Sequence, residues 1–197
     1  MKAEIKEKRY KISSTGSSKG LINLFSEYNI SSGSIGTISK DDVLRPEEAV
    51  LSWSTRSNSN RIKLEYHKEK LIHYQVELPF KNKKYRMDPI GQKNTLDPVS
   101  FMLWFLRDRS STNLCKGGVR VLDGERLTVV SFTQRLNFGA TISCRGVLER
   151  LEGFKPKTMK RKPVEFNILY GSIENERFNV KEFNFETFLG KVVAKEE

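Results

Sequence analysis

The two histidines are the first candidates for catalysis, because histidine can exchange protons near neutral pH. His67 and His73 fall in two alternating runs, 61–67 and 72–78, on the face opposite the apolar residues. A Ser-His-Asp or Cys-His arrangement instead holds its histidine in a cleft, between a nucleophile and an orienting group. The pattern therefore predicts two solvent-facing histidines without a catalytic role.

Other motifs that bind metals or phosphate are missing from the sequence. Cys115 and Cys144 show neither C-x-x-C spacing nor a nearby histidine pair, as a zinc site needs. The stretch 116–118 (Lys-Gly-Gly) lacks the spacing of a P-loop. The adjacent acids 41–42 and 47–48 are typical of exposed turns, whereas acid/base catalysis needs two carboxyl groups in different environments. We therefore expect no enzyme, no cofactor and no metal site.

The composition describes a basic, folded protein. The 197 residues are 37% hydrophobic and carry a net charge of +11, and this length fits a single β-rich domain over residues 1–197. No apolar run approaches the roughly 20 residues that cross a bilayer, so we expect no transmembrane segment. The first ten residues have no apolar core, so we expect no signal peptide in the chain as given. The charge favours anionic partners.

Short alternating runs, separated by turn residues, indicate many antiparallel strands. In the clearest hairpin, Ile62, Leu64 and Tyr66 share one face, and after a turn at 68–70 the alternation resumes with Ile72 and Tyr74. Further strands are predicted at 10–15, 34–39, 49–55, 119–122, 127–132, 141–151, 164–170, 178–187 and 191–194. The fold class is all-β and mainly antiparallel, as a curved sheet or a partial barrel or roll.

Residues 97–109 predict one helix. Asp97 is a good N-cap and Pro98 suits the first helical position. Arg107 and Arg109 follow where cations favour a helix C-terminus. Apolar residues surround nearly the whole helix, so we expect it to be buried on the concave face of the sheet, with core residues Phe101, Trp104 and Phe105. The apolar stretch 20–28 fits either a strand or a short helix.

Two loops are strongly basic. They contribute the predicted basic surface: Lys81, Lys83, Lys84, Arg86, Lys157, Lys160, Arg161 and Lys162. Phe80 and Tyr85 interleave with the first group, a mixture that can bind single-stranded nucleic acid. No recognised nucleic-acid motif accompanies it, so we expect a solvated surface or contact with an anionic component in preference to nucleic acid.

The two cysteines leave the compartment open. Cys115 and Cys144 lie 29 positions apart and fit either one disulfide in an oxidising space or two buried thiols in a reducing one. The residues alone do not decide between these alternatives.

Several stretches, taken in order, resemble the bacterial family known as domain of unknown function 3108, in the form found in alphaproteobacterial exported proteins. They are 9–16 with Gly20-Leu21, then 95–100, 121–126, Cys144 and 183–193. The most specific are the Leu-Asp-Pro helix start at 96–98 and the Asp-Gly turn at 123–124. The resemblance implies a periplasmic protein and a Cys115–Cys144 disulfide, and it carries over no catalytic residue. Family members also have a signal peptide and a strand before the position of Tyr10, both of which we expect to be absent here.

The expected function is non-enzymatic binding of a lipid-like, or other apolar or anionic, component of the cell envelope. This step is an analogy from architecture, and a fold does not determine a function. The alternative is a structural or adaptor protein with a filled core that binds partners through its basic loops, and a hydrolase is a distant third. A cavity left between helix and sheet would favour the first function, and a solid core the second.

Overall fold

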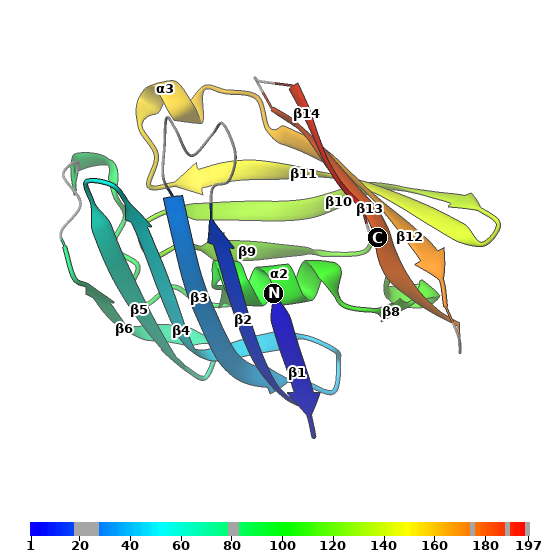
Figure 1. Ribbon diagram of the computed structural model, residues 1–197, viewed down its shortest axis with the longest axis horizontal. Helices are drawn as coiled ribbons and strands as arrows, with labels where there is room; N and C mark the ends of the chain where they lie inside the picture. Colours follow the sequence, from blue (N-terminus) through cyan, green and yellow to red (C-terminus); the bar gives the residue numbers. More distant parts are fainter. Residues whose placement is uncertain (18–27, 79–82, 174–175, 188–189, 196–197) are drawn as a thin grey trace. The chain divides into compact units, whose positions relative to one another are not determined.

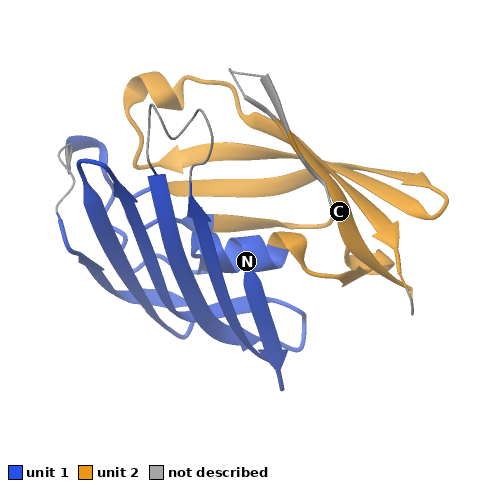
Figure 2. Cartoon of the chain, viewed as in Figure 1, with its two compact units in different colours: residues 1–104, 121–126 blue, residues 105–120, 127–197 orange. Residues whose placement is uncertain are grey.

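The computed structural model describes residues 1–17, 28–78, 83–173, 176–187 and 190–195 (Figure 1). It is 63% strand and 11% helix, which confirms the all-β class. The described residues form two compact units (Figure 2). Unit 1 holds residues 1–104 and 121–126, and unit 2 holds residues 105–120 and 127–197. Of the undecided stretch 20–28, only Tyr28 is described, as the first residue of a strand.

Unit 1 is built on a six-stranded antiparallel sheet, sheet A, with the order β1-β2-β3-β4-β5-β6. Its strands are β1 (Lys2–Lys6), β2 (Arg9–Ser17), β3 (Tyr28–Ile38), β4 (Leu44–Thr55), β5 (Ser59–His67) and β6 (Lys70–Val76). The 3-10 helix η1 (Lys83–Tyr85), the short strand β7 (Thr95–Leu96) and most of helix α2 (Pro98–Leu106) follow. Alternation places Ala49, Leu51, Ile62 and Leu64 on one face of sheet A, called the inner face below.

The β5–β6 hairpin confirms the predicted pairing but corrects its turn. Lys68 and Glu69 alone form the turn, and both have positive φ (46° and 67°), the conformation of a tight two-residue hairpin. Glu65 pairs with His73 and Tyr66 with Leu71, so Ile72 is an extra, bulged residue. Leu71 is therefore fully buried, and Ile72, predicted to face inward, is 53% exposed.

The predicted absence of a strand before Tyr10 is wrong, because β1 occupies residues 2–6 and pairs with β2. All five residues of β1 are exposed, so Ala3 and Ile5, which alternate with charged residues, form no buried face. The strand is short, and its pairing with β2 does not depend on a buried apolar face. Charged side chains are typical of edge strands, where they discourage pairing with other chains.

A buried hydrogen-bond network fixes the start of α2 against sheet A. Asp97 is fully buried, and its Oδ1 accepts hydrogen bonds from the backbone amides of Val99 and Ser100, both at 2.9 Å, which confirms it as the N-cap. Its Oδ2 accepts from the hydroxyls of Ser100 (2.6 Å) and Ser34 of β3 (2.9 Å). The Tyr10 hydroxyl of β2 lies 2.7 Å from Ser100 Oγ. Four polar groups therefore hold the first turn of α2 on two strands of the sheet.

The C-terminal end and the exposure of the helix differ from the prediction. α2 ends at Leu106, and Arg109 lies in the short strand β8 (Arg109–Ser110), where it pairs with Phe178. The chain leaves the helix after Leu106 because Arg109 pairs with Phe178 of another strand, so neither Arg107 nor Arg109 lies in the last turn of α2. Trp104 and Phe105 are buried as predicted, but Phe101 is only half-buried.

Unit 2 is built on antiparallel strands in the order β14-β13-β12-β11-β10, and β8 pairs with β13. They are β10 (Leu127–Phe138), β11 (Thr141–Glu152), β12 (Val164–Ser172), β13 (Arg177–Thr187) and β14 (Gly190–Lys195). The unit also contains the 3-10 helix η2 (Ser111–Asn113) and helix α3 (Pro156–Met159), and β9 (Gly118–Leu122) leads from unit 2 into unit 1. The sheet curls as a half-barrel, as predicted. The ring of Phe105 packs edge-on against Phe166 and Phe183, with centroids 5.5 and 4.9 Å away.

A disulfide joins Cys115 to Cys144 of β11 within unit 2, as the family resemblance implied. The two Cα atoms are 5.1 Å apart, inside the range that a disulfide allows. Cys144 is fully buried. The bond ties the irregular segment before β9 to a central strand.

Replacing Trp104 should destabilise the protein. Trp104 is 8% exposed, whereas Met102 of the same helix is 37% exposed. Removing a buried indole costs about 3–5 kcal/mol, so Trp104→Ala should lower the free energy of unfolding by that amount in a urea titration. Met102→Ala is the matched control and should change it by less than about 1 kcal/mol. Equal effects of the two changes would contradict the burial of this side of α2.

Replacing Asp97 tests the network that starts the helix. Asp97→Ala removes an N-cap and leaves two buried hydroxyls without their acceptor, so it should cost about 2–4 kcal/mol. Asp97→Asn keeps a cap oxygen and should cost about 1 kcal/mol. The comparison is made by chemical unfolding at neutral pH. A tolerated alanine would show that the network does not hold the helix.

The difference in stability between the native chain and Asp97→Asn should depend on pH. Burial raises the pKa of Asp97 above its usual value of 3.8, against its hydrogen bonds with Ser100 and Ser34, which lower it. The folded state thus binds the proton more tightly than the unfolded state, so the carboxyl group's contribution to stability falls as pH rises from about 4. The advantage of the native chain over Asp97→Asn should shrink between about pH 4 and pH 7. An advantage that grows over this range would contradict the raised pKa.

Breaking the disulfide should also destabilise the protein. Closing a loop of 29 residues contributes about 3–4 kcal/mol in the chain-entropy model. The double variant Cys115→Ala/Cys144→Ala should lose about that much in a denaturant titration. Adding a reductant should lower the stability of the native chain but leave the double variant unchanged.

Candidate functional site

The candidate site is a pocket of about 410 Å³ within unit 1, a volume typical of small-molecule sites. It lies on the inner face of sheet A, beside the first residue of α2. Three segments line it, 28–32 of β3, 51–53 of β4 and 123–126 of the β9–β10 turn, together with one residue each from β5, α2 and the loop after η1. The lining residues are Tyr28, Ile30, Ser32, Leu51, Ser52, Trp53, Ile62, Arg86, Pro98, Asp123, Glu125 and Arg126.

One wall of the pocket is apolar. Leu51 and Trp53 follow each other at alternate positions of β4, and Ile30 lies opposite Trp53 in the β3–β4 register. Leu51 is nearly buried, but Ile30 is 38% exposed and Tyr28 is 40% exposed. The apolar stripe of the sheet thus continues beyond the start of α2, where Pro98 borders the pocket.

A polar wall of the pocket begins with the Asp-Gly turn between β9 and β10. Oδ1 of Asp123 accepts hydrogen bonds from the amides of Glu125 (3.3 Å) and Arg126 (2.9 Å). Gly124 has φ +106°, and a Cβ there would lie 3.1 Å from side-chain atoms of both Ile62 and Tyr74. The turn therefore needs glycine for its backbone and for the space, and it packs directly on the sheet.

Glu125 carries the central charge of this polar wall. Its side chain is 10% exposed, and its Oε2 lies 3.4 Å from Nε of Arg86, which is 17% exposed. The Tyr74 hydroxyl donates to its other oxygen, Oε1, at 2.9 Å. Burial, and then this hydrogen bond, raise the pKa of Tyr74 well above its ordinary value, so the hydroxyl remains a donor. A buried arginine–glutamate pair is thus fixed in place by a tyrosine.

Arg126 and Asp123 form the outer part of the polar wall. The Arg126 guanidinium lies 3.9 Å from the Asp123 carboxylate, and both side chains are 42% exposed. Burial raises the pKa of Asp123, whereas Arg126 and the two backbone amides lower it. Such a long, exposed ion pair contributes little, so an incoming anion can compete for this guanidinium. The pocket therefore offers an apolar wall to a hydrocarbon group and an arginine at its rim to an anionic group.

The residues of the predicted basic surface differ in their burial and in their partners. Arg86 is not part of a solvated surface, because its side chain is mostly buried and paired with Glu125. Lys84 is exposed and lies 5.9 Å from the ring of Tyr85. Lys81 lies outside the described residues, and Lys83 belongs to η1. Lys157, Lys160, Arg161 and Lys162 are exposed around α3 in unit 2.

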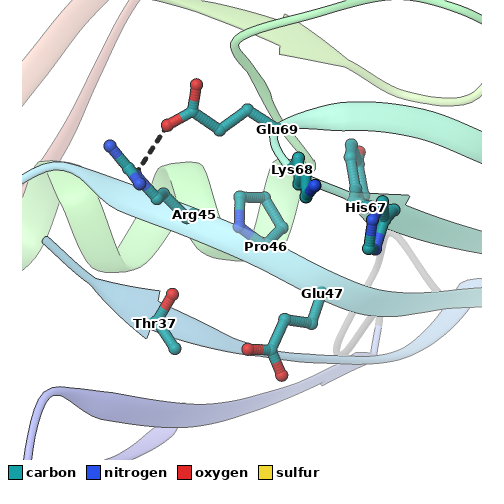
Figure 3. A pocket seen from close by; sticks show the side chains of 8 residues that line it. Thr37, Arg45, Pro46, Glu47, His67, Lys68 and Glu69 are labelled. Atoms are coloured by element: carbon teal, nitrogen blue, oxygen red, sulfur yellow. Dashed lines mark ion pairs between the residues drawn. The ribbon is translucent and has the colours of Figure 1, made fainter.

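Both histidines are exposed on sheet A, as predicted. His67 lines a second pocket of about 650 Å³ in unit 1, formed by β3, β4 and the Lys68-Glu69 turn (Figure 3). Arg45 pairs there with Glu69 at 2.6 Å, and Glu47 pairs with Arg9 at 2.6 Å. Glu47 and Glu48 thus lie within β4, where we predicted an exposed turn, and they form ion pairs with Arg9 and Lys63. Within the lining of this pocket Arg45 and Glu69 pair with each other, whereas Glu47 pairs with Arg9 outside it.

Sequence reasoning missed most of the candidate site. It identified Asp123-Gly124 as a turn and Pro98 as a helix start, but it did not connect these positions with Ile30 or Trp53. One signal was present: exposed apolar residues at the ends of strands that otherwise alternate cleanly. Their meaning depends on which other segments lie beside them, and that information is not local.

In the parts of the chain that the structure describes, no helix has the length and apolar character to cross a membrane. Across those same residues, no three histidine, cysteine or acidic side chains gather as a metal site would require. Comparison with known proteins found no matching family model, no matching curated protein and no matching solved structure.

Proposed function

We propose that the pocket in unit 1 makes this protein a non-enzymatic binding module for an amphipathic anion, such as a fatty acid or one acyl chain of a lipid. The observation that carries the proposal is that one pocket is lined both by the apolar side chains of Ile30, Leu51 and Trp53 and by Arg126. The hydrocarbon part would pack on the apolar side chains. The anionic head would pair with the guanidinium at the rim.

The volume and the inner charges limit the ligand. A pocket of about 410 Å³ lies near the lower end of the range for small-molecule sites, which favours a single chain over a whole two-chain lipid. Arg86 is already paired with Glu125 inside the site, so the inner polar wall is close to neutral. The exposed rim arginine, Arg126, therefore selects the charge of the head group.

We further propose that the protein works in the periplasm and is related to the family of domain of unknown function 3108. The Cys115–Cys144 disulfide supports an oxidising compartment. Two of the stretches that carry the resemblance, 95–100 and 121–126, supply Pro98 and the polar wall of the pocket. The resemblance and the candidate site thus involve the same segments.

Charge placed on the apolar wall should weaken binding. Ile30 and Ile35 belong to the same strand and are each 38% exposed, but only Ile30 lines the pocket. Ile30→Asp should weaken the binding of a fluorescent long-chain fatty-acid probe at least about tenfold, because a carboxylate would face both the hydrocarbon chain and the anionic head. Ile35→Asp is the matched control and should bind as the native chain does. Equal losses in the two variants would contradict the pocket as the binding site.

Head-group selection gives a second arm of the same experiment. The native chain should bind the fatty acid more tightly than the long-chain alcohol of equal length. Arg126→Glu should reverse this preference, whereas Arg61→Glu, an exposed position of β5 outside the pocket, should preserve it. If the native chain binds neither compound, the proposed function is wrong, and the adaptor function with a filled core is favoured.

A further inference from the structure

The segment between β11 and β12 is the most positively charged stretch of unit 2. Residues 155–163 contain Lys155, Lys157, Lys160, Arg161 and Lys162, and no acidic residue. All five cations are exposed. The nearest acids along the chain, Glu152 and Glu165, lie outside the segment. This segment is called the basic segment below.

The backbone of the basic segment is held in a defined conformation. The amides of Thr158 and Met159 donate to the carbonyl of Lys155 at 2.8 and 3.0 Å, which makes α3 a single turn of helix (Figure 1). Arg150 of β11 donates to the carbonyl of Lys162 at 3.2 Å and ties the end of the segment to the sheet. The cationic side chains therefore project from a fixed turn.

An apolar side chain lies among these cations. Met159 is 40% exposed, although methionine is ordinarily a core residue. An exposed apolar group surrounded by lysines and an arginine is the arrangement of proteins that lie on anionic membranes, where the cations meet the head groups and the apolar group enters the boundary with the acyl chains.

We propose that the basic segment docks unit 2 on the surface of an anionic lipid bilayer. Clusters of four to eight lysines or arginines are sufficient to hold a protein at such a surface, and this segment has five. The inference goes beyond the proposed function and does not rest on it, because the pocket lies in unit 1 and the basic segment in unit 2.

The composition of the segment favours a bilayer over nucleic acid. Residues 155–163 contain no aromatic side chain on which a base could stack. Four of the five cations are lysines, which act as point charges and lack the planar fork with which arginine reads bases. The exposed Met159 adds nothing to phosphate binding but does add contact with lipid.

The test is co-sedimentation of the whole protein with vesicles. Phosphatidylcholine vesicles that contain phosphatidylglycerol should bind the native chain, more weakly as salt rises, and pure phosphatidylcholine vesicles should not. The triple variant Lys157→Gln/Lys160→Gln/Lys162→Gln should bind on the order of 100-fold more weakly. The matched control, Lys2→Gln/Lys11→Gln/Lys40→Gln, removes three exposed charges from unit 1 and should change binding by less than about fivefold. Equal losses in the two triple variants would overturn the proposal, because net charge alone would then explain binding.

Methionine variants test the apolar contact. Met159 and Met102 are 40% and 37% exposed, so Met159→Ser and Met102→Ser remove equally accessible side chains. Only Met159→Ser should weaken vesicle binding, by several-fold, with an unchanged thermal midpoint. The proposal would be overturned if Met159→Ser bound vesicles as tightly as the native chain. It would also be overturned if a single-stranded oligonucleotide bound more tightly than the vesicles at the same salt concentration. Either result would favour a polyanion-binding surface. Because Ile30→Asp should leave vesicle binding intact, failure of the pocket can be distinguished from failure of this surface.

Discussion

The carboxylate of Asp97 is the constraint on which unit 1 depends. A fully buried carboxylate needs several hydrogen-bond donors, and its donors come from the first turn of α2 and from Ser34 of β3. These donors coincide only when α2 begins at one position on the sheet. Gly36 makes that position possible, because a Cβ there would lie 2.6 Å from the Tyr10 hydroxyl and 2.3 Å from the carbonyl oxygen of Arg45. The network therefore selects where the helix begins as well as stabilising it.

The position of the helix in turn creates the pocket. α2 covers sheet A from Pro98 onward, and the apolar stripe of β3 and β4 extends past that point to Ile30 and Trp53. A second constraint closes the other side, because Gly124 allows the β9–β10 turn to approach Ile62 closely and brings Asp123 and Arg126 to the rim. The site is thus a consequence of capping and turn geometry, with no dedicated structural element of its own.

The sequence predicted those features that depend on neighbouring residues. Alternation located most strands, and the Asp97-Pro98 pair located the helix start, because capping and alternation are local effects. The bulge at Ile72 was missed, since it depends on the register between two strands. The helix end was missed because it depends on a distant strand: Arg109 pairs with Phe178, and α2 therefore ends at Leu106. The pocket was missed because it depends on tertiary contacts: Ile30 and Trp53 lie about seventy or more residues before the 123–126 turn.

The basic residues show how similar sequence patterns can have different outcomes. Arg86 and Lys160 both belong to lysine-rich loops, and both were expected on a solvated surface. Arg86 is drawn inward because Glu125, which arrives from a distant turn, would otherwise be a buried charge without a cation, and the cost of that arrangement is large. The stretch 155–163 contains no acidic residue that could draw one of its cations inward, and all five cations are exposed. The position of the few buried acids therefore decides which part of the +11 charge stays at the surface, where an anionic partner can meet it.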